Sequence, residues 1–283
     1  MSKKILITGA NGQLGQSIKK LSENNNDMFY FHDVDTLDLT DTVKLKEYVT
    51  GLYPDFIVNC AAYNLVDKAE EDSQTAFLLN SDVPGNLAVI AHETGSHLIH
   101  ISTDYVFDGM QFKPYTEEDN PNPVSVYGKS KFEGESKVMA FPRHSVIRTS
   151  WLYSEYGNNF VKTILRLGKE KNELKVISDQ VGSPTYATDL AKAILSVISE
   201  KYISGIYHYS NEGVCSWFDF AHEIIEQSGI ECDILPIDGK DYPSKAKRPY
   251  YSLMSKNKIK SVFQLEIPHW KASLKTCIEN ITA

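Results

Sequence analysis

Residues 4–16, KILITGANGQLGQ, join an apolar run of strand type to three glycines and then to a helical pattern. Gly9, Gly12 and Gly15 recur at intervals of three residues. Glycine lets the backbone turn sharply and approach a pyrophosphate, whose charge then lies at the helix N-terminus. The spacing is GxxGxxG and not the standard GxGxxG. Its place between a strand and a helix nevertheless favours a dinucleotide-binding turn over a plain tight turn.

Strand-like runs alternate with helical patterns through the first two thirds of the chain. The predicted strands are residues 4–8, 28–33, 56–60, 97–102, 145–149 and 174–177. Such alternation predicts a parallel sheet with helices on both faces. We therefore expect an α/β protein with a doubly wound, Rossmann-type sheet.

The sequence changes in character after about residue 210, where prolines fall in a loop-rich stretch. We predict an NAD(P)-binding Rossmann domain and a smaller C-terminal substrate-binding lobe. The domain comprises residues 1–150 and a return of the chain around 171–210, and the lobe comprises residues 151–170 and 211–283. A ligand is expected in the cleft between the lobe and the carboxyl edge of the sheet.

Charge and composition exclude several classes of partner. The net charge of −8 argues against nucleic acid, whose binding normally needs a basic face. No apolar run reaches the roughly 18 residues that would cross a membrane, so no membrane partner is expected. The N-terminus enters a strand-like run without a visible signal peptide, and the four cysteines lack a CxxC spacing. We therefore predict a cytoplasmic protein with reduced thiols.

Asp33 ends the second predicted strand, 18 residues after Gly15. A carboxylate there suits hydrogen bonds to a ribose 2′-hydroxyl and repels a 2′-phosphate, which favours NADH over NADPH. Lys19 or Lys20 folding over the site would weaken this preference, and a solvated loop acid is the alternative for Asp33. The predicted cofactor contacts are Gly9, Asn11, Gly12, Gln13, Leu14, Gly15, Asp33, Asp38, Leu39, Asn59, Ala61, Ala62, Tyr63 and Asn80. For Asn59, Ala61 and Ala62 the alternative is plain packing.

The stretch SVYGKSK, residues 125–131, places Tyr127 and Lys131 four positions apart. On a helix these positions share one face, and a lysine ammonium is expected to lower the pKa of the tyrosine. Thr103, after the fourth predicted strand, would supply a hydroxyl to the carbonyl oxygen of a substrate. We predict that Tyr127 is a general acid and that both it and Lys131 also contact the cofactor ribose. Two residues on a solvated helix are the alternative.

Several motifs match a known family in order along nearly the whole chain. They are VNCAAYNLVDKAE (58–70), STDYVFDG (102–109), YGKSKFEGE (127–135), RTSWLY (148–153), GNNF (157–160), DQVGSPT (179–185) and RPYYSLMSKNK (248–258). The chain thereby resembles the extended short-chain dehydrogenases/reductases and, within them, the dTDP-4-dehydrorhamnose reductases.

The resemblance implies that NADH or NADPH reduces the 4-keto group of a dTDP-6-deoxyhexose, giving dTDP-rhamnose, with Tyr127 as proton donor. It also implies a set of contacts with this sugar nucleotide: Val66, Asp104, Tyr105, Trp151, Asn158, Asn159 and Arg248. For Trp151 the alternative is core packing. For Arg248, the expected partner of the diphosphate, it is a structural ion pair.

The resemblance is incomplete at one position. Family members with a magnesium-bridged dimer carry a glutamate two residues past the third glycine, where this chain has Ser17. We therefore predict no metal, and a monomer or a homodimer.

Two other functions are compatible with the same cofactor fold. A nucleotide-sugar 4-epimerase, or another extended reductase, would use the same tyrosine and lysine. A non-catalytic NAD(P)-binding subunit that regulates a methionine adenosyltransferase would not need them. The intact Thr103, Tyr127 and Lys131 argue against the regulatory subunit, and the motifs STDYVFDG and RTSW favour the reductase over the epimerase.

Overall fold

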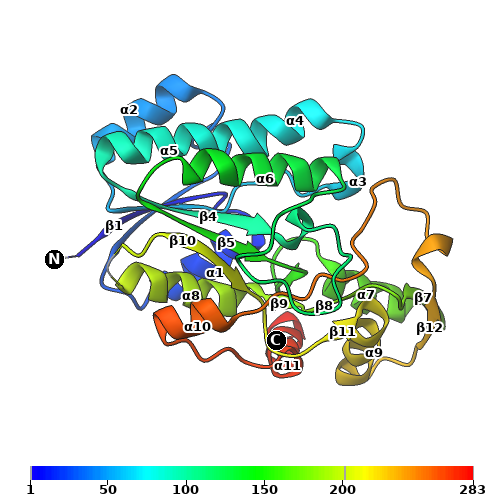
Figure 1. The fold of residues 1–283 in the computed structure, drawn as a ribbon. Coiled ribbons are helices and arrows are strands. Elements are labelled where there is room, and N and C mark those ends of the chain that lie inside the picture. Colours follow the sequence, from blue (N-terminus) through cyan, green and yellow to red (C-terminus); the bar gives the residue numbers. More distant parts are fainter. Residues whose placement is uncertain (1, 201, 283) are drawn as a thin grey trace.

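The central sheet has six parallel strands in the computed structural model, which describes residues 2–200 and 202–282 (Figure 1). In spatial order they are β10 (Gly205–Tyr209), β5 (His144–Thr149), β4 (His97–Thr103), β3 (Phe56–Asn59), β1 (Lys4–Thr8) and β2 (Met28–His32). The chain starts at β1, goes outward to β2, and then returns past β1 to β3. Strand order therefore reverses between β1 and β3, which is where such sheets bind ligands. The predicted doubly wound fold is confirmed.

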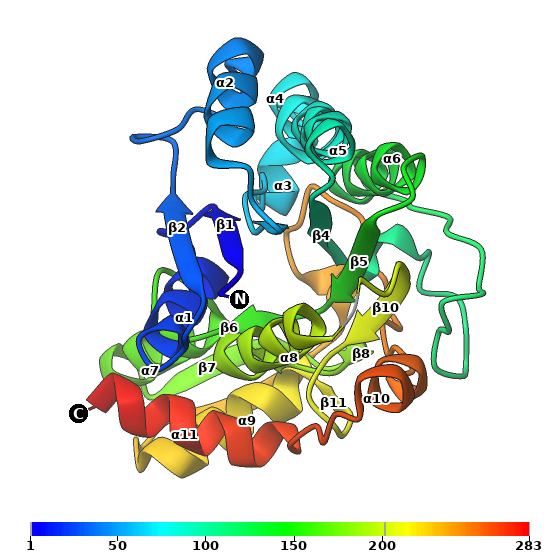
Figure 2. The same cartoon turned by 90° about the vertical axis from the view of Figure 1, so that its left-hand side faces the viewer.

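Helices cover both faces of this sheet, as Figure 2 shows. One face carries α2 (Thr42–Leu52), α5 (Val83–Thr94) and α6 (Val126–Met139), and the other carries α1 (Gln13–Ser22), α8 (Ala187–Ser199) and α10 (Asn257–Phe263). The side chains of β1 alternate between two cores, because Leu6 packs under the first group of helices and Ile5 and Ile7 under the second. Burial on both faces explains why the central strands read as nearly unbroken apolar runs.

A smaller lobe packs beside the sheet (Figure 1). Its strands are β7 (Glu173–Ile177) and β12 (Asp233–Ile237), and its helices are α7 (Phe160–Glu170), α9 (Trp217–Ser228) and α11 (Trp270–Thr282). Two short ladders complete it: β6 (Leu152–Tyr153) with β9 (Thr185–Tyr186), and β8 (Val181–Gly182) with β11 (Cys215–Ser216). The lobe has its own apolar core around Phe220 and Leu274.

The strand predicted at residues 174–177 exists, but its expected place in the main sheet is wrong. It belongs to β7, which pairs with β12 outside that sheet. Glu173 and Lys175 are exposed on one face of β7, whereas a strand covered by helices on both faces would be apolar throughout. The sixth strand of the main sheet is β10, which the sequence patterns did not predict.

The remaining elements are short connections. They are α3 (Val66–Ala69), α4 (Ser73–Phe77), a π-helical turn (Leu78–Asp82) and two 3₁₀ turns (Asp104–Val106 and Gly239–Asp241). Across residues 2–200 and 202–282, no helix combines the length and apolar character that crossing a membrane requires.

Candidate active site

The glycine turn between β1 and α1 is packed so tightly that side chains are excluded. Gly9 has a φ of 66°, and a Cβ atom there would lie 2.6 Å from the backbone nitrogen of Ala61. A Cβ atom on Gly15 would lie 2.5 Å from the carbonyl oxygen of Gly9. Gly12 caps α1, and no side chain of the described residues bonds to the free N–H groups of this first turn. The turn therefore fits a dinucleotide pyrophosphate, since these N–H groups are the donors that phosphates bind.

Two adjoining hollows form one cleft along the carboxyl edge of the sheet. The first, of about 450 Å³, lies beside Asp33, and the second, of about 500 Å³, contains Tyr127. They are continuous, because five residues line both: Gly9, Gly12, Cys60, Ala62 and Asn64.

Most of the predicted cofactor residues line this cleft. They are Gly9, Asn11, Gly12, Gln13, Leu14, Asp33, Asp38, Leu39, Ala61, Ala62, Tyr127 and Lys131. Gly15, Asn59, Tyr63 and Asn80 are not among the lining residues. The Asn59 carboxamide oxygen accepts from the Thr8 hydroxyl at 2.8 Å, and Asn80 hydrogen-bonds both backbone groups of Tyr63. These side chains therefore hold the loops that the lining residues occupy.

The Asp33 carboxylate is fixed at the end of β2. Its two oxygens accept from the backbone nitrogens of Asn11 and Val34, each at 2.8 Å. Asp38 lines the same hollow, and no lysine or arginine is among its lining residues in the described chain. The hollow therefore suits the hydroxyl groups of a ribose more than a phosphate.

The start of α6 is docked against the segment that follows β4. Ser125 caps the helix by accepting from the Gly128 nitrogen at 3.1 Å. A Cβ atom on Gly128 would lie only 2.2 Å from the carbonyl oxygen of Tyr105, so only glycine allows this approach. The docking brings Tyr127 and Lys131 into the cleft together with Thr103, and all three line the second hollow.

Lys131 is buried below Tyr127 on the same helix face. Its ammonium donates a hydrogen bond of 2.6 Å to the carbonyl oxygen of Ile101. Burial lowers the pKa of Lys131 to about 8, and the negative charge of Glu135 opposes part of this shift. The lysine therefore loses its proton at a pH that is only slightly above neutral.

The expected lowering of the Tyr127 pKa is wrong. Burial raises this pKa to about 12, a hydrogen bond with Thr103 offsets part of the rise, and the charge of Asp104 adds to it. Desolvation of the phenolate thus sets the direction of the shift, which the spacing alone could not reveal. The phenol stays protonated at neutral pH, which is the form that a proton donor needs.

The floor of the second hollow holds polar atoms without partners. The Thr103 hydroxyl donates to one Asp104 oxygen at 3.0 Å. The other Asp104 oxygen and the Ser102 hydroxyl have no hydrogen-bond partner among the described residues, although both are buried. Burial raises the pKa of Asp104 to about 6, and the hydrogen bond from Thr103 offsets part of this rise. Unpaired buried polar atoms are costly, so a polar ligand in this cleft would satisfy them.

The predicted substrate residues fall into two groups. Those that line the second hollow are Val66, Asp104, Tyr105, Trp151, Asn158 and Asn159. Arg248 is not among the lining residues, and its guanidinium donates to Asp67 at 2.8 Å. Asn159 caps α7 by accepting from Lys162 and also donates to the Gln13 side chain at 3.0 Å. Its amide therefore joins the glycine turn to the lobe.

The sequence predictions omitted other residues that line the cleft. They include Val34, Leu37, Cys60, Asn64, Leu79, Val83, Ile101, Thr149, Ser150, Leu152 and Gly157. Many of them lie at or just beyond the carboxyl ends of β3, β4 and β5. That position was a usable signal, since every parallel strand of such a sheet delivers its last residues to the ligand edge.

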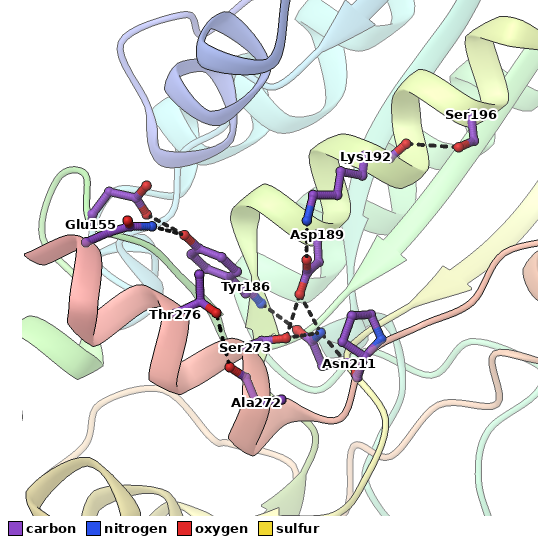
Figure 3. A network of polar contacts seen from close by, with 11 residues as sticks. Glu155, Tyr186, Asp189, Lys192, Ser196, Asn211, Ala272, Ser273 and Thr276 are labelled. Carbon is purple, nitrogen blue, oxygen red and sulfur yellow. Dashed lines mark hydrogen bonds and ion pairs between the residues drawn. The ribbon is translucent and has the colours of Figure 1, made fainter. Parts of the chain in front are cut away.

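A separate hollow of about 320 Å³ lies between α1, α8 and α11. Figure 3 shows the polar network beside it, in which Asp189 accepts from Ser273 at 2.6 Å and from Asn211 at 2.9 Å. Ser17, at the position where the resemblance implies a glutamate in magnesium-bridged dimers, is buried at this hollow. No group of three or more His, Cys, Asp or Glu in residues 2–200 and 202–282 is arranged to hold a metal ion. The network fastens α11 of the lobe to α8 of the Rossmann layer.

The family model for the RmlD substrate binding domain matches residues 3–283. A dTDP-4-dehydrorhamnose reductase of Aggregatibacter actinomycetemcomitans is 39% identical over 285 residues, covering 96% of this chain and 97% of the relative. The crystal structure of a dTDP-4-dehydrorhamnose reductase from Clostridium acetobutylicum ATCC 824 has 44% identity and a TM-score of 0.96, covering 99% and 100% of the two chains. One from Bacillus anthracis str. Ames, in complex with NADP, has 39% identity, the same TM-score and the same coverage.

Proposed function

Because the chain belongs to the RmlD substrate binding domain family, we propose that it reduces the 4-keto group of dTDP-4-dehydrorhamnose to give dTDP-rhamnose. The family predicted from the motifs is thereby confirmed. The observation that carries the proposal is the convergence of Thr103, Tyr127 and Lys131 in a cleft whose other half is a dinucleotide turn. Bound NADH or NADPH supplies the hydride for this reaction.

The residues of the second hollow manage the proton and the carbonyl oxygen. Tyr127, neutral because of its burial, donates its phenolic proton to the oxygen at C4 of the sugar. The Thr103 hydroxyl, which donates to Asp104 in the free protein, turns to donate to the same oxygen and orients it. The Lys131 ammonium, held by the Ile101 carbonyl, stabilises the phenolate that remains. A positioned acid of this kind contributes about 10²–10⁴ in rate.

We propose that the lobe predicted at residues 151–170 and 211–283, with β7 added, binds the sugar nucleotide. Trp151 would lie against the sugar, since it is among the residues that line the second hollow. Arg248 would meet the diphosphate with the part of its guanidinium that Asp67 does not occupy.

A coupled assay tests the proposed reaction. The purified protein is mixed with NADH or NADPH and with the 4-keto sugar nucleotide made from dTDP-glucose by a dehydratase and an epimerase. We expect stoichiometric loss of reduced nicotinamide and, by NMR, a product with a hydroxyl at C4. Interconversion of C4 epimers without net consumption of the coenzyme would instead identify an epimerase. A protein inactive in this assay but bound to an adenosyltransferase would be a regulatory subunit. The relatives compared above are named as reductases and give neither alternative support.

We propose that NADH is preferred, although one close relative was crystallised with NADP. Two carboxylates, Asp33 and Asp38, line the hollow that would receive the 2′ position of the adenine ribose. Asp33→Asn removes one charge and keeps an oxygen that can accept from Asn11. We expect the ratio of kcat/KM for NADPH to that for NADH to rise about tenfold or more, because a like-charge contact is relieved.

The matched control is Asp35→Asn, which removes an equal charge from an exposed residue that is not among those lining the hollow. This variant should leave the coenzyme ratio within about twofold of the wild type, given its exposure. Equal changes in both variants would mean that Asp33 acts only through net charge and does not read the ribose.

The low pKa of Lys131 sets an expected upper limit of activity. The ammonium form is present below a pH of about 8 and is lost as the pH rises through that value. We therefore expect kcat/KM, which reports the free enzyme, to fall above a pH of about 8. The stability effect has the opposite sign. Between a pH of about 8 and the ordinary lysine pKa of 10.5, only the unfolded chain keeps this proton, so rising pH favours the folded state.

Lys131→Arg tests this assignment, because arginine stays charged throughout the accessible pH range. Whatever activity this variant retains should lack the decline above a pH of about 8. A decline at the same pH in wild type and variant would assign it to another group.

We also propose that the reaction takes place in the cytoplasm. The cytoplasm supplies NADH and NADPH, which the reaction consumes. All four cysteines are free thiols, as is usual in a reducing compartment.

A further inference from the structure

Trp151, on the wall of the second hollow, has a backbone conformation that residues with side chains rarely adopt. Its φ is 48°, in the left-handed region. Such a conformation costs free energy and persists only where the surroundings determine it. The structure around the indole ring must therefore hold this residue in place.

Trp217, the first residue of α9, covers the indole of Trp151. The two rings are stacked with centroids 3.6 Å apart and planes inclined by only 11°. Trp217 itself packs against Phe160, with centroids 4.6 Å apart, and both tryptophans pack on the lobe core. Trp217 is not among the residues that line the cleft, so it reaches a ligand only through Trp151.

Gly182 of β8 makes a second contact that restricts the position of the Trp151 ring. A Cβ atom on Gly182 would lie 3.0 Å from Cε2 of the Trp151 ring and 2.6 Å from the Ser252 hydroxyl. Gly182 pairs with Cys215 in the ladder of β8 and β11, and β11 leads directly into Trp217. One short ladder therefore sets both the gap at Gly182 and the position of the covering ring.

We propose that Trp217 is a positioning residue for sugar binding, which it serves by holding the Trp151 indole as the flat wall of the sugar site. This role rests on the proposed function, because it requires that the sugar of the nucleotide lies against Trp151. The contact acts on binding of the sugar and leaves the proton transfer at Tyr127 unchanged. Coenzyme binding is also unchanged, since the stacked pair belongs to the lobe.

The test compares Trp217→Ala, Trp217→Phe and the wild type. We expect KM for the sugar nucleotide to rise about tenfold in Trp217→Ala, with kcat and KM for NADH within about twofold. Trp217→Phe should recover part of this loss, because a phenyl ring still stacks on an indole. Two indoles stacked so closely also couple their electronic transitions. The wild type should therefore show paired far-ultraviolet dichroism bands of opposite sign, which both variants lose, and this readout needs no substrate.

Trp270→Phe is the control for a merely structural effect. Trp270 is buried in the same lobe core, 5.7 Å from Phe220 between ring centroids. Its replacement should lower the melting temperature but leave KM and the paired bands intact.

If Trp217→Ala does not fold, Trp217→Phe and Gly182→Ala test the proposal instead. The Cβ added in Gly182→Ala displaces the Trp151 ring, so this variant should raise KM for the sugar nucleotide to a similar extent. A KM unchanged in the folded Trp217 variants, or raised equally in Trp270→Phe, would overturn the positioning role. A wild type inactive on the sugar nucleotide would overturn the proposed function, and the role in sugar binding with it.

Discussion

Replacement of Tyr127 by phenylalanine is expected to lower kcat by about 10²–10⁴-fold while coenzyme affinity stays nearly normal. The variant removes the only atom through which this side chain can donate a proton. It keeps the ring, which is buried and packs edge-on against Tyr105 at a centroid distance of 5.4 Å. The measurement is a steady-state titration of both substrates, with coenzyme binding followed by nicotinamide fluorescence.

Tyr153→Phe is the matched control for this loss. Tyr153 is also fully buried, and its hydroxyl has no hydrogen-bond partner among the described residues. It packs in the lobe core against Phe220, away from the proton-transfer residues. Its kcat should remain within about twofold of the wild type. If Tyr127→Phe retains a kcat similar to that of Tyr153→Phe, the proton comes from another group.

The parts of the fold that the sequence predicted best are those governed by local rules. The glycine turn and β1 could be read from a strand, three glycines and a helix, because close approach of backbones leaves no alternative to glycine there. β10 was missed because its sequence, GIYHY, carries polar groups within a buried strand. His208 is accommodated only by distant partners, the Arg148 guanidinium and the Tyr115 carbonyl. Such partners are set by tertiary structure and leave no local pattern.

In the active site, too, features set by local sequence were predictable and features set by tertiary structure were not. The four-residue spacing of Tyr127 and Lys131 correctly placed both on one helix face, and the cleft contains both. The direction of the Tyr127 pKa shift depends on burial, which spacing does not specify. The stacking of Trp217 on Trp151 joins residues 66 positions apart in the sequence. No sequence periodicity links these two residues, because the ladder of β8 and β11 is what brings Trp217 to Trp151.

The largest expected effect on stability is at the ion pair that anchors α6 to β5. Arg148 donates to both carboxylate oxygens of Glu135, at 2.9 and 2.7 Å, and the side chains are 1% and 0% exposed. Arg148→Met leaves the Glu135 carboxylate buried without its partner, which should lower the free energy of unfolding by about 3–5 kcal/mol. Urea unfolding followed by circular dichroism measures this change. Glu135 also supports the charge of Lys131 one helical turn away, so the pair serves both the fold and the site.

The matched control uses the ion pair of Arg166 and Glu170, which are 61% and 52% exposed. Arg166→Met removes the same kind of side chain and should cost less than about 1 kcal/mol, because water already solvates both charges. The double variant Arg148→Met/Glu135→Leu should recover much of the loss, since it removes the buried charge together with its partner. Equal losses for Arg148→Met and Arg166→Met would mean that the Glu135 carboxylate is satisfied without Arg148. In that case packing against neighbouring elements such as α5, β4 and β5 would hold α6 without the ion pair.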